Sequence, residues 1–302
     1  MKVAEGLGAG RLLGRLMLAL ALSAVLVAPT AGAGASVSSR RLDPYAGLGT
    51  WLPIYVFAKK AWRNPEQQVA AMARNGARTL YLETGNYKQR VDLVRPRAVG
   101  RFVDAAHAAG LRVVAWYLPS FGRPRQDERR ALAAIRFRSA SGERFDAFAL
   151  DIEATVVRRI GLRNQRLLRL SARLRAAVGP AYPLGAITPS PVGMSPSYWP
   201  GIPYRALARS YDVFLPMAYS TLRGVRGSRA TRAYLSATVA AIRTGTRNPN
   251  IRIHLIGGLS GKMGVAETAG FMHAVADCAP LGYSLYAFPG THRAAWTALN
   301  GR

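Results

Sequence analysis

Eight apolar, strand-like runs alternate with helix-like segments along most of the chain, and this alternation limits the possible folds more than any other feature. Alternating strands and helices imply parallel strands joined by helical crossovers. Eight such units in about 255 residues are typical of a closed (β/α)8 barrel, the TIM barrel. The sequence therefore predicts one α/β domain over residues 47–302, with strands at 51–57, 78–83, 111–118, 146–153, 183–188, 211–218, 251–257 and 282–288.

Proline and glycine mark the helix boundaries. Pro65 and Pro96 stand where two helices are expected to begin, and Gly76 and Gly110 stand where they are expected to end. Further helices are expected at 163–178, 203–209, 229–244, 264–279 and 291–299. A doubly wound open sheet is the alternative fold, but no G-x-G-x-x-G motif follows the first strand.

The first 35 residues have the organisation of a secretory signal peptide. Basic residues precede an apolar stretch of 13 residues, Leu16–Ala28, and small residues at 31–35 fit a cleavage site. A membrane-spanning helix needs about 20 apolar residues, so an uncleaved anchor is the less favoured alternative. We expect removal of residues 1–35, a linker over residues 36–46, and a secreted or extracytoplasmic protein with no membrane span after cleavage.

The charge of the chain is strongly positive. The formal net charge is +27, and residues 1–35 hold three cations and one carboxylate, so the mature chain would keep +25. Such a charge attracts polyanions, among them anionic cell-wall polymers, although the abundance of Ala, Arg and Gly also allows a purely compositional origin. The sequence contains no nucleic-acid-binding motif, so specific nucleic acid recognition is not expected.

Cysteine and histidine usage predicts neither a disulfide nor a metal site. Cys278 is the only cysteine, so no internal disulfide can form. The four histidines, at positions 107, 254, 273 and 292, lack the spacing of metal ligands. No organic cofactor is indicated either.

Two carboxylates follow an apolar run at 145–153. Asp151 and Glu153 stand two residues apart, and side chains at i and i+2 of a strand share one face. Two acids side by side in a desolvated place repel each other, so one of them can stay protonated near neutral pH. Glycoside hydrolysis needs such a group to protonate the leaving oxygen. The alternative is that the two acids cap the next helix or pair with arginines.

Other polar and aromatic residues stand at predicted strand ends, where the active site of a TIM barrel lies. Glu83 and Tyr219 end the second and sixth strands. Glu83 would be a second carboxylate facing the pair or a buried structural acid. Aromatic candidates for stacking on sugar rings, each also compatible with core packing, are Trp51, Trp116, Tyr117, Trp199 and Tyr286.

Two motifs resemble glycoside hydrolase family 18, the chitinase-like barrels. The stretch from Asp146 to Glu153 resembles the D-G-x-D-x-D-x-E strand of that family, and residues 217–220 (Met-Ala-Tyr-Ser) resemble its M-x-Y-D strand. The resemblance implies that Glu153 is the general acid, that Asp151 orients the N-acetyl group of the substrate, and that Tyr219 helps to hold that group.

The chain departs from both motifs. Ala149 and Ser220 stand where the family has acids, and Ala147 stands where it has Gly. The stretch 150–153 (Leu-Asp-Ile-Glu) also resembles the D-x-E strand of family 25, the lysozyme-type barrels. That family has an Asp on its first strand, where this chain offers Pro53 and Tyr55. The motifs together cover about twelve residues and favour a hydrolase-like barrel over any single family.

These observations predict a secreted glycoside hydrolase-like protein that acts on a cell-envelope or environmental polysaccharide. Glu153 would supply the acid, and Asp151, Glu83 and Tyr219 would assist it. Because two family acids are missing, the alternative is a non-catalytic barrel of the cell envelope that binds glycans or polyanions.

Overall fold

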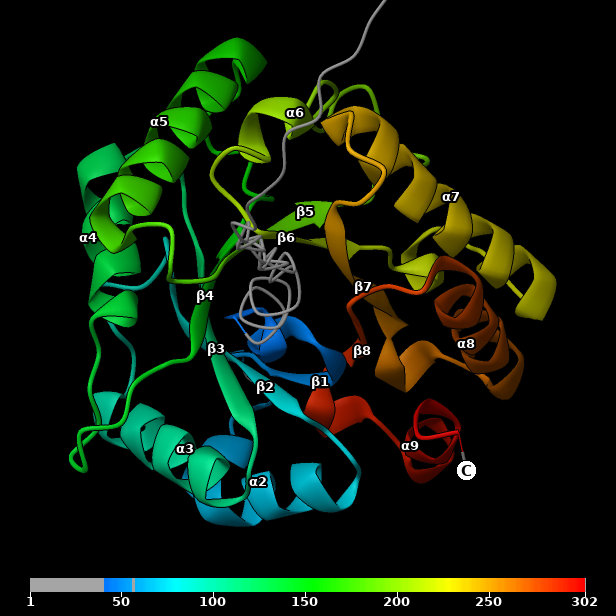
Figure 1. Cartoon of the computed structure of the whole chain (residues 1–302), viewed down its shortest axis with the longest axis horizontal. Helices are drawn as coiled ribbons and strands as arrows, with labels where there is room; N and C mark the ends of the chain where they lie inside the picture. The colour runs from blue at the N-terminus through cyan, green and yellow to red at the C-terminus, as the bar shows by residue number, and fades with distance from the viewer. Residues whose placement is uncertain (1–40, 56–57, 302) are drawn as a thin grey trace, which may run out of the picture.

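The computed structural model describes residues 41–55 and 58–301, and in them eight parallel strands close into a barrel (Figure 1). The strands pair in chain order, and β1 pairs with β8 to complete the ring. The predicted TIM barrel is confirmed; the predicted signal peptide lies outside the described residues. The strands are β1 (Gly47–Leu52), β2 (Thr79–Asn86), β3 (Arg112–Leu118), β4 (Ala147–Asp151), β5 (Leu184–Pro189), β6 (Val213–Met217), β7 (Arg252–Leu259) and β8 (Gly282–Tyr286).

An outer ring of helices surrounds the barrel (Figure 1). None of the helices in the described residues is long and apolar enough to cross a membrane. The α-helices are α2 (Pro65–Arg74), α3 (Pro96–Ala108), α4 (Pro124–Ile135), α5 (Ile160–Val178), α6 (Tyr204–Leu207), α7 (Ser228–Thr246), α8 (Val265–Cys278) and α9 (Arg293–Leu299). Short 3-10 turns are η1 (Asp43–Tyr45), η3 (Ala61–Arg63), η4 (Ser220–Leu222), η5 (Ser260–Lys262) and η6 (Phe288–Gly290).

Helix α4 is missing from the predicted helices for a physical reason. Two of the residues that it buries are charged, Asp127 and Arg130, and the other two central ones are alanines. The helix therefore shows no stripe of large apolar residues, which is the sequence signal of an amphipathic helix.

The first strand begins earlier than the sequence predicts. The prediction placed it at 51–57, whereas β1 ends at Leu52, directly before Pro53, which has no N–H to donate to a ladder. The strand begins at Gly47 and includes a second glycine, Gly49, whose lack of a side chain is needed for packing. A Cβ atom on Gly49 would lie 2.5 Å from the ring of Tyr81, so only glycine leaves room for that ring inside the barrel.

The end of the predicted linker belongs to the barrel. Tyr45 is fully buried at the amino ends of the strands, and its hydroxyl donates to the carbonyl of Phe148 at 2.7 Å. Arg41 pairs with Asp212 at 2.9 Å. Residues 41–46 therefore close one end of the barrel and do not act as a free linker.

A chain of hydrogen bonds crosses the barrel interior. His254 Nδ1 lies 2.9 Å from the carbonyl oxygen of Tyr45, and burial lowers the pKa of His254 to about 4. The ring is thus neutral at pH 7, with Nδ1–H donating to the carbonyl and Nε2 accepting from Ser284, 2.9 Å away. Ser284 in turn accepts from Trp51 Nε1 at 2.8 Å. This chain fixes the orientation of the Trp51 ring.

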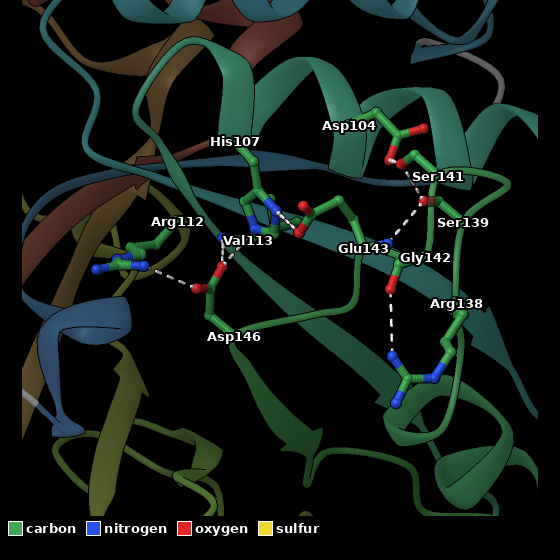
Figure 2. Close-up of polar contacts among 10 residues, drawn as sticks. All are labelled: Asp104, His107, Arg112, Val113, Arg138, Ser139, Ser141, Gly142, Glu143 and Asp146. Carbon is green, nitrogen blue, oxygen red and sulfur yellow. Dashed lines mark hydrogen bonds and ion pairs between the residues drawn. The ribbon is translucent and has the colours of Figure 1, made fainter.

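A second polar cluster ties the loop before β4 to helix α3 on the amino-end face (Figure 2). His107 lies between two acids, 2.7 Å from Glu143 and 2.9 Å from Asp146. Asp146 also accepts from Arg112 at 3.1 Å and from the N–H of Val113 at 2.8 Å. Asp146, the first acid of the motif that resembles family 18, therefore lies at the start of β4 and has a structural role there.

Replacing Gly282 by Ala is expected to destabilise the barrel by about 2–3 kcal/mol, since overpacking a filled core has costs of this size. The added Cβ would lie 2.2 Å from the carbonyl oxygen of Tyr45 and 2.3 Å from His254 Nδ1. Gly161→Ala is the control, because no atom lies within 4 Å of its Cβ position. Urea unfolding measures both variants, and equal stability of the two would contradict the packing argument.

Replacing His107 by Gln is expected to destabilise the protein more at pH 5.5 than at pH 9. Hydrogen bonds and charge from Asp146 and Glu143 raise the pKa of His107 above its usual value. Protonated His107 therefore stabilises the folded state. This contribution is complete below the unfolded-state pKa of about 6.5 and is lost as the pH rises through the folded-state pKa. At pH 5.5 we expect the free energy of unfolding of His107→Gln to be about 1 kcal/mol lower than that of wild type.

Thermal unfolding of wild type, His107→Gln and His273→Gln across this pH range checks the expectation. His273 is exposed on α8 and controls for the loss of a histidine. A stability loss in His107→Gln that does not change with pH would refute it.

Candidate active site

The alternation of side chains along β4 points its acid into the barrel. Ala147 and Ala149 face the barrel interior, whereas Phe148 and Leu150 pack against the helices. Asp151 ends the strand with the same parity, and Glu153 follows two residues later on the same side. The sequence prediction that the two acids share one face is thereby realised at the carboxyl-end face of the barrel.

A cavity of about 110 Å³ opens there, which we call the acid pocket. One water needs about 10–15 Å³, so the pocket holds several waters or part of a sugar. Residues from seven of the eight strands or from just after them line it, together with one residue of the segment after β1. The lining residues are Trp51, Tyr55, Trp116, Asp151, Glu153, Ile187, Met217, Tyr219, Ile256 and Tyr286. Six of the nine candidate site residues thus meet in one place.

Tyr117, a predicted sugar-stacking residue, does not reach the acid pocket. It follows the inward-facing Trp116 on β3 and therefore points to the helical layer, where its hydroxyl donates to Asp127 at 2.8 Å. Trp199 is likewise held outside the pocket, because its ring nitrogen donates to Asn164 at 2.8 Å. Both rings belong to the core, which corrects the sugar-stacking prediction for Tyr117 and for Trp199 and agrees with the core-packing alternative.

Glu83 lies beside the acid pocket and not in its lining. The side chain is fully buried on β2 and accepts hydrogen bonds from the N–H of Ile54 at 2.9 Å and from Asn86 at 3.2 Å. Burial and, to a smaller extent, the nearby Glu153 raise the pKa of Glu83 to about 7 against these two hydrogen bonds. Glu83 therefore holds the segment after β1 and also contributes to the field on the pair.

The two pocket acids are protonated more easily than free carboxyls. Burial, then repulsion from Glu153 and Glu83, raises the pKa of Asp151, and burial raises the pKa of Glu153. Within residues 41–55 and 58–301, no arginine, lysine or histidine pairs with either acid. In the part of the chain that the structure describes, arginines therefore do not neutralise the pair. Both carboxyls therefore hold a proton more readily than free acids do.

Aromatic rings form the floor and walls of the acid pocket. Trp51 stacks on Tyr81 with centroids 4.2 Å apart and meets the Trp116 ring edge-on at 6.0 Å. Tyr219 and Tyr286 lie 5.9 Å apart on the other side. The arrangement presents flat apolar faces next to two acids, as a site for a sugar ring requires.

Two polar atoms in the lining have no hydrogen-bond partner in the described structure. One is the acceptor Asp151 Oδ1 and the other is the donor Trp116 Nε1, both buried. Buried polar groups are nearly always hydrogen-bonded, so such atoms are suited to pair with a bound ligand. A ligand with one N–H or O–H group and one acceptor oxygen would satisfy both.

Residues far away in the sequence position Glu153. The Tyr198 hydroxyl donates to the Glu153 carbonyl at 2.8 Å, and Arg163 on α5 donates to the Tyr198 carbonyl at 2.7 Å. The Arg163 guanidinium also lies over the Trp199 ring, 4.0 Å from its centroid. Sequence reasoning missed Tyr198 and Arg163, since no local motif marks them. Tyr55, in the pocket lining, was noted only as a departure from family 25.

No protein-family model and no curated protein matches the sequence. Solved structures do match. A chitinase from Chromobacterium violaceum is 13% identical with a TM-score of 0.59, covering 84% of this chain and 98% of that one. A family 18 chitinase from Cycas revoluta in complex with allosamidin is 11% identical with a TM-score of 0.61, covering 85% and 99%.

Other glycoside hydrolases match at a similar level. The spore cortex-lytic enzyme SleL of Bacillus cereus is 10% identical with a TM-score of 0.61, covering 84% of this chain and 74% of that one. The fold resembles that of family 18 chitinases and related glycoside hydrolase barrels. Identities this low establish the fold alone, so the chemistry must be argued from the acid pocket.

Neutralising Asp151 is expected to lower the pKa of Glu153, because a negative neighbour no longer opposes its ionisation. Carboxyl-carbon NMR titration of Asp151→Asn and wild type measures this shift. Asp277→Asn, which removes an acid paired with Arg232 on the outer surface, is expected to leave the Glu153 titration unchanged. Titration of Glu153 at the same pH in all three proteins would mean that the two pocket acids do not interact.

Proposed function

We propose that this protein is a glycoside hydrolase acting on a polysaccharide, with Glu153 as the general acid. The observation that carries the proposal is a pair of acids with raised pKa values, Asp151 buried and Glu153 half-buried, in an aromatic-lined pocket. TIM-barrel enzymes place their catalytic groups at this end of the strands. The similarity to chitinase structures supports the proposal, and one of them, from Cycas revoluta, was determined with (GlcNAc)4 bound.

The acid step follows from the position of the proton. Glycosidic bond cleavage needs a protonated acid that can give its proton to the leaving oxygen. Glu153 is less buried than Asp151, which is 5% exposed, so Glu153 is the acid that a substrate can reach. In the empty pocket the more deeply buried Asp151 competes for the shared proton.

Substrate binding would move that proton to Glu153. If the unpaired Asp151 Oδ1 accepts an N–H of the substrate, the ionised form of Asp151 is stabilised. The proton then stays on Glu153, where it is needed. An N-acetyl group supplies such an N–H, in agreement with the role that the family resemblance implies for Asp151.

A second protein nucleophile is missing from the pocket lining. Among its residues only Asp151 and Glu153 carry carboxyl groups, and both come from the end of β4. We therefore propose that the acetamido oxygen of the substrate attacks the anomeric carbon while the bond to the leaving oxygen breaks. Glu153 gives its proton to that oxygen, and a water then opens the cyclic intermediate, with one proton returning to Glu153. The rings of Trp51 and Tyr286 would hold the sugar.

The missing family acids motivate a second candidate function, a non-catalytic glycan-binding barrel. Ser220 replaces one of these acids, and its side chain is fully buried and donates to the Gly257 carbonyl at 3.3 Å. Ser220 therefore cannot act on a substrate. Ala149 replaces the other acid beneath Asp151 and brings no charge to the pair. Secretion and affinity for anionic wall polymers remain predictions for either function.

Glu153→Gln is expected to keep the fold and lower hydrolysis of chitin oligosaccharides or peptidoglycan glycan by about 10²–10⁴-fold, the usual worth of a general acid. Asp151→Asn is expected to lower activity. The decline of its activity with rising pH is expected to begin at a lower pH than in wild type. Glu66→Gln, an exposed acid paired with Arg101, is the control and should retain activity.

Reducing-sugar release from several polysaccharides measures all four proteins, and circular dichroism checks their folding. Full hydrolysis by Glu153→Gln would show that Glu153 is not the acid. Binding of glycans by wild type without any hydrolysis would establish the non-catalytic function instead.

A further inference from the structure

A groove of about 740 Å³ runs between α4 and α5 on the outside of the barrel. The two helices lie side by side in Figure 1, and arginine dominates the groove between them. We call it the arginine groove. The cations that line it are Arg123, Arg125 and Arg129 from the start of α4 and Arg166, Arg169 and Arg173 from α5.

Few acids neutralise these arginines. Arg129 makes two hydrogen bonds to Asp92, and Arg173 pairs with Glu128 at 2.7 Å. The side chain of Arg166 donates only to the backbone carbonyls of residues 121 and 122 and so keeps its charge. In the described part of the chain, Arg123, Arg125 and Arg169 form no ion pair. Six cations and two paired acids leave four positive charges along the groove.

The arginines are arranged in rows. Arg166, Arg169 and Arg173 follow each other at intervals of three and four residues, which places them on one face of α5. At 1.5 Å per residue their axial spacings are about 4.5 and 6 Å. On α4, Arg125 and Arg129 are four residues apart. Rows of this kind match a linear partner that carries anionic groups at regular short intervals better than they match a single small anion.

The other lining residues favour a sugar polymer over a nucleic acid. Single-stranded nucleic acids are held by aromatic side chains on which bases stack, together with basic residues. The lining of the arginine groove contains no aromatic residue. It contains Gln126 and Gln165, whose amides donate to and accept from hydroxyl groups. Arginine forks pair with carboxylates in a bidentate manner.

The arginine groove begins at the same end of the barrel as the acid pocket. Helices α4 and α5 start after β3 and β4, the strands that carry Trp116 and Asp151. A second hollow, of about 470 Å³, continues the groove at the start of α5 and is lined by Arg159 together with Leu162 and Gln165, which also line the groove. A chain in the groove can therefore extend towards the rim of the pocket.

We propose that the arginine groove binds a polysaccharide that carries carboxylate groups along its chain. Resting on the proposed function, the groove would hold the acidic chain while the acid pocket acts on a sugar of the same polymer. The preferred substrate would then be a glycan that carries carboxylate groups in addition to the N-acetyl groups that the acid pocket requires.

The test compares two triple variants that each lose three positive charges. The groove variant is Arg123→Gln, Arg125→Gln, Arg169→Gln. The control variant is Arg74→Gln, Arg97→Gln, Arg229→Gln, from α2, α3 and α7, whose arginines are exposed and form no ion pair in the described residues. Biolayer interferometry measures binding to polygalacturonate, neutral dextran and duplex DNA at 50 and 200 mM salt, after thermal unfolding has shown equal folding.

We expect the groove variant to bind polygalacturonate at least tenfold more weakly than wild type, and the control variant to lose less than threefold. Wild type should bind dextran weakly and without dependence on salt. Equal losses in the two variants would overturn the proposal, because net charge alone would then explain binding. The proposal would also be overturned if wild type did not bind polygalacturonate. It would likewise be overturned if wild type bound duplex DNA more tightly than polygalacturonate and only the groove variant lost the DNA binding.

Failure of this proposal can be told apart from failure of the proposed function. Glu153→Gln is expected to bind polygalacturonate as wild type does, since it leaves the groove intact. If binding depends on the groove but no glycan is hydrolysed, the binding site is confirmed and the proposed enzymatic function is refuted. Hydrolysis of glycans together with groove-independent binding would keep the enzyme and refute the groove.

Discussion

The structure depends on how eight strands share the small interior of the barrel. Parallel strands alternate their side chains strictly, so every second residue must fit inside a space that seven other strands also fill. Glycines at 49, 185 and 282 make room there for the rings of Tyr45, Tyr81 and His254. These rings fill the half of the interior near the amino ends of the strands. Trp51 lies above them as the floor of the acid pocket, so space remains only near the carboxyl ends of the strands.

This arrangement separates the charges of the molecule. The arginines of the groove lie on the outer helices, in contact with water and surface acids, whereas Asp151 and Glu153 line the acid pocket without a cationic partner in the described residues. Burial raises the pKa of both acids, and repulsion from Glu153 and Glu83 raises that of Asp151 further. A basic protein thus keeps an acidic pocket whose carboxyls can hold a proton. The arginine groove and the acid pocket can therefore contact different parts of one polymer.

Periodicity predicted most of the elements because the barrel buries its strands on both faces and its helices on one. Seven strands and seven α-helices lie close to their predicted positions. The exceptions have local causes: β1 is built partly of glycine, and α4 buries Asp127 and Arg130 where an apolar stripe is expected. The site prediction was right about proximity for residues of inward parity and failed for Tyr117, whose parity is opposite to that of Trp116.

By itself the sequence determined the parallel strands, their order and the placement of Asp151 and Glu153 at the end of one of them, because these follow from periods of two and of three to four residues along the chain. Only the tertiary structure decided the state of those acids. The removal of water and the nearness of Glu83 come from segments distant in sequence, and so does the hydrogen bond from Tyr198 that holds the backbone of Glu153. Solvation and charge interactions depend on distances in space, and only barrel closure sets those distances.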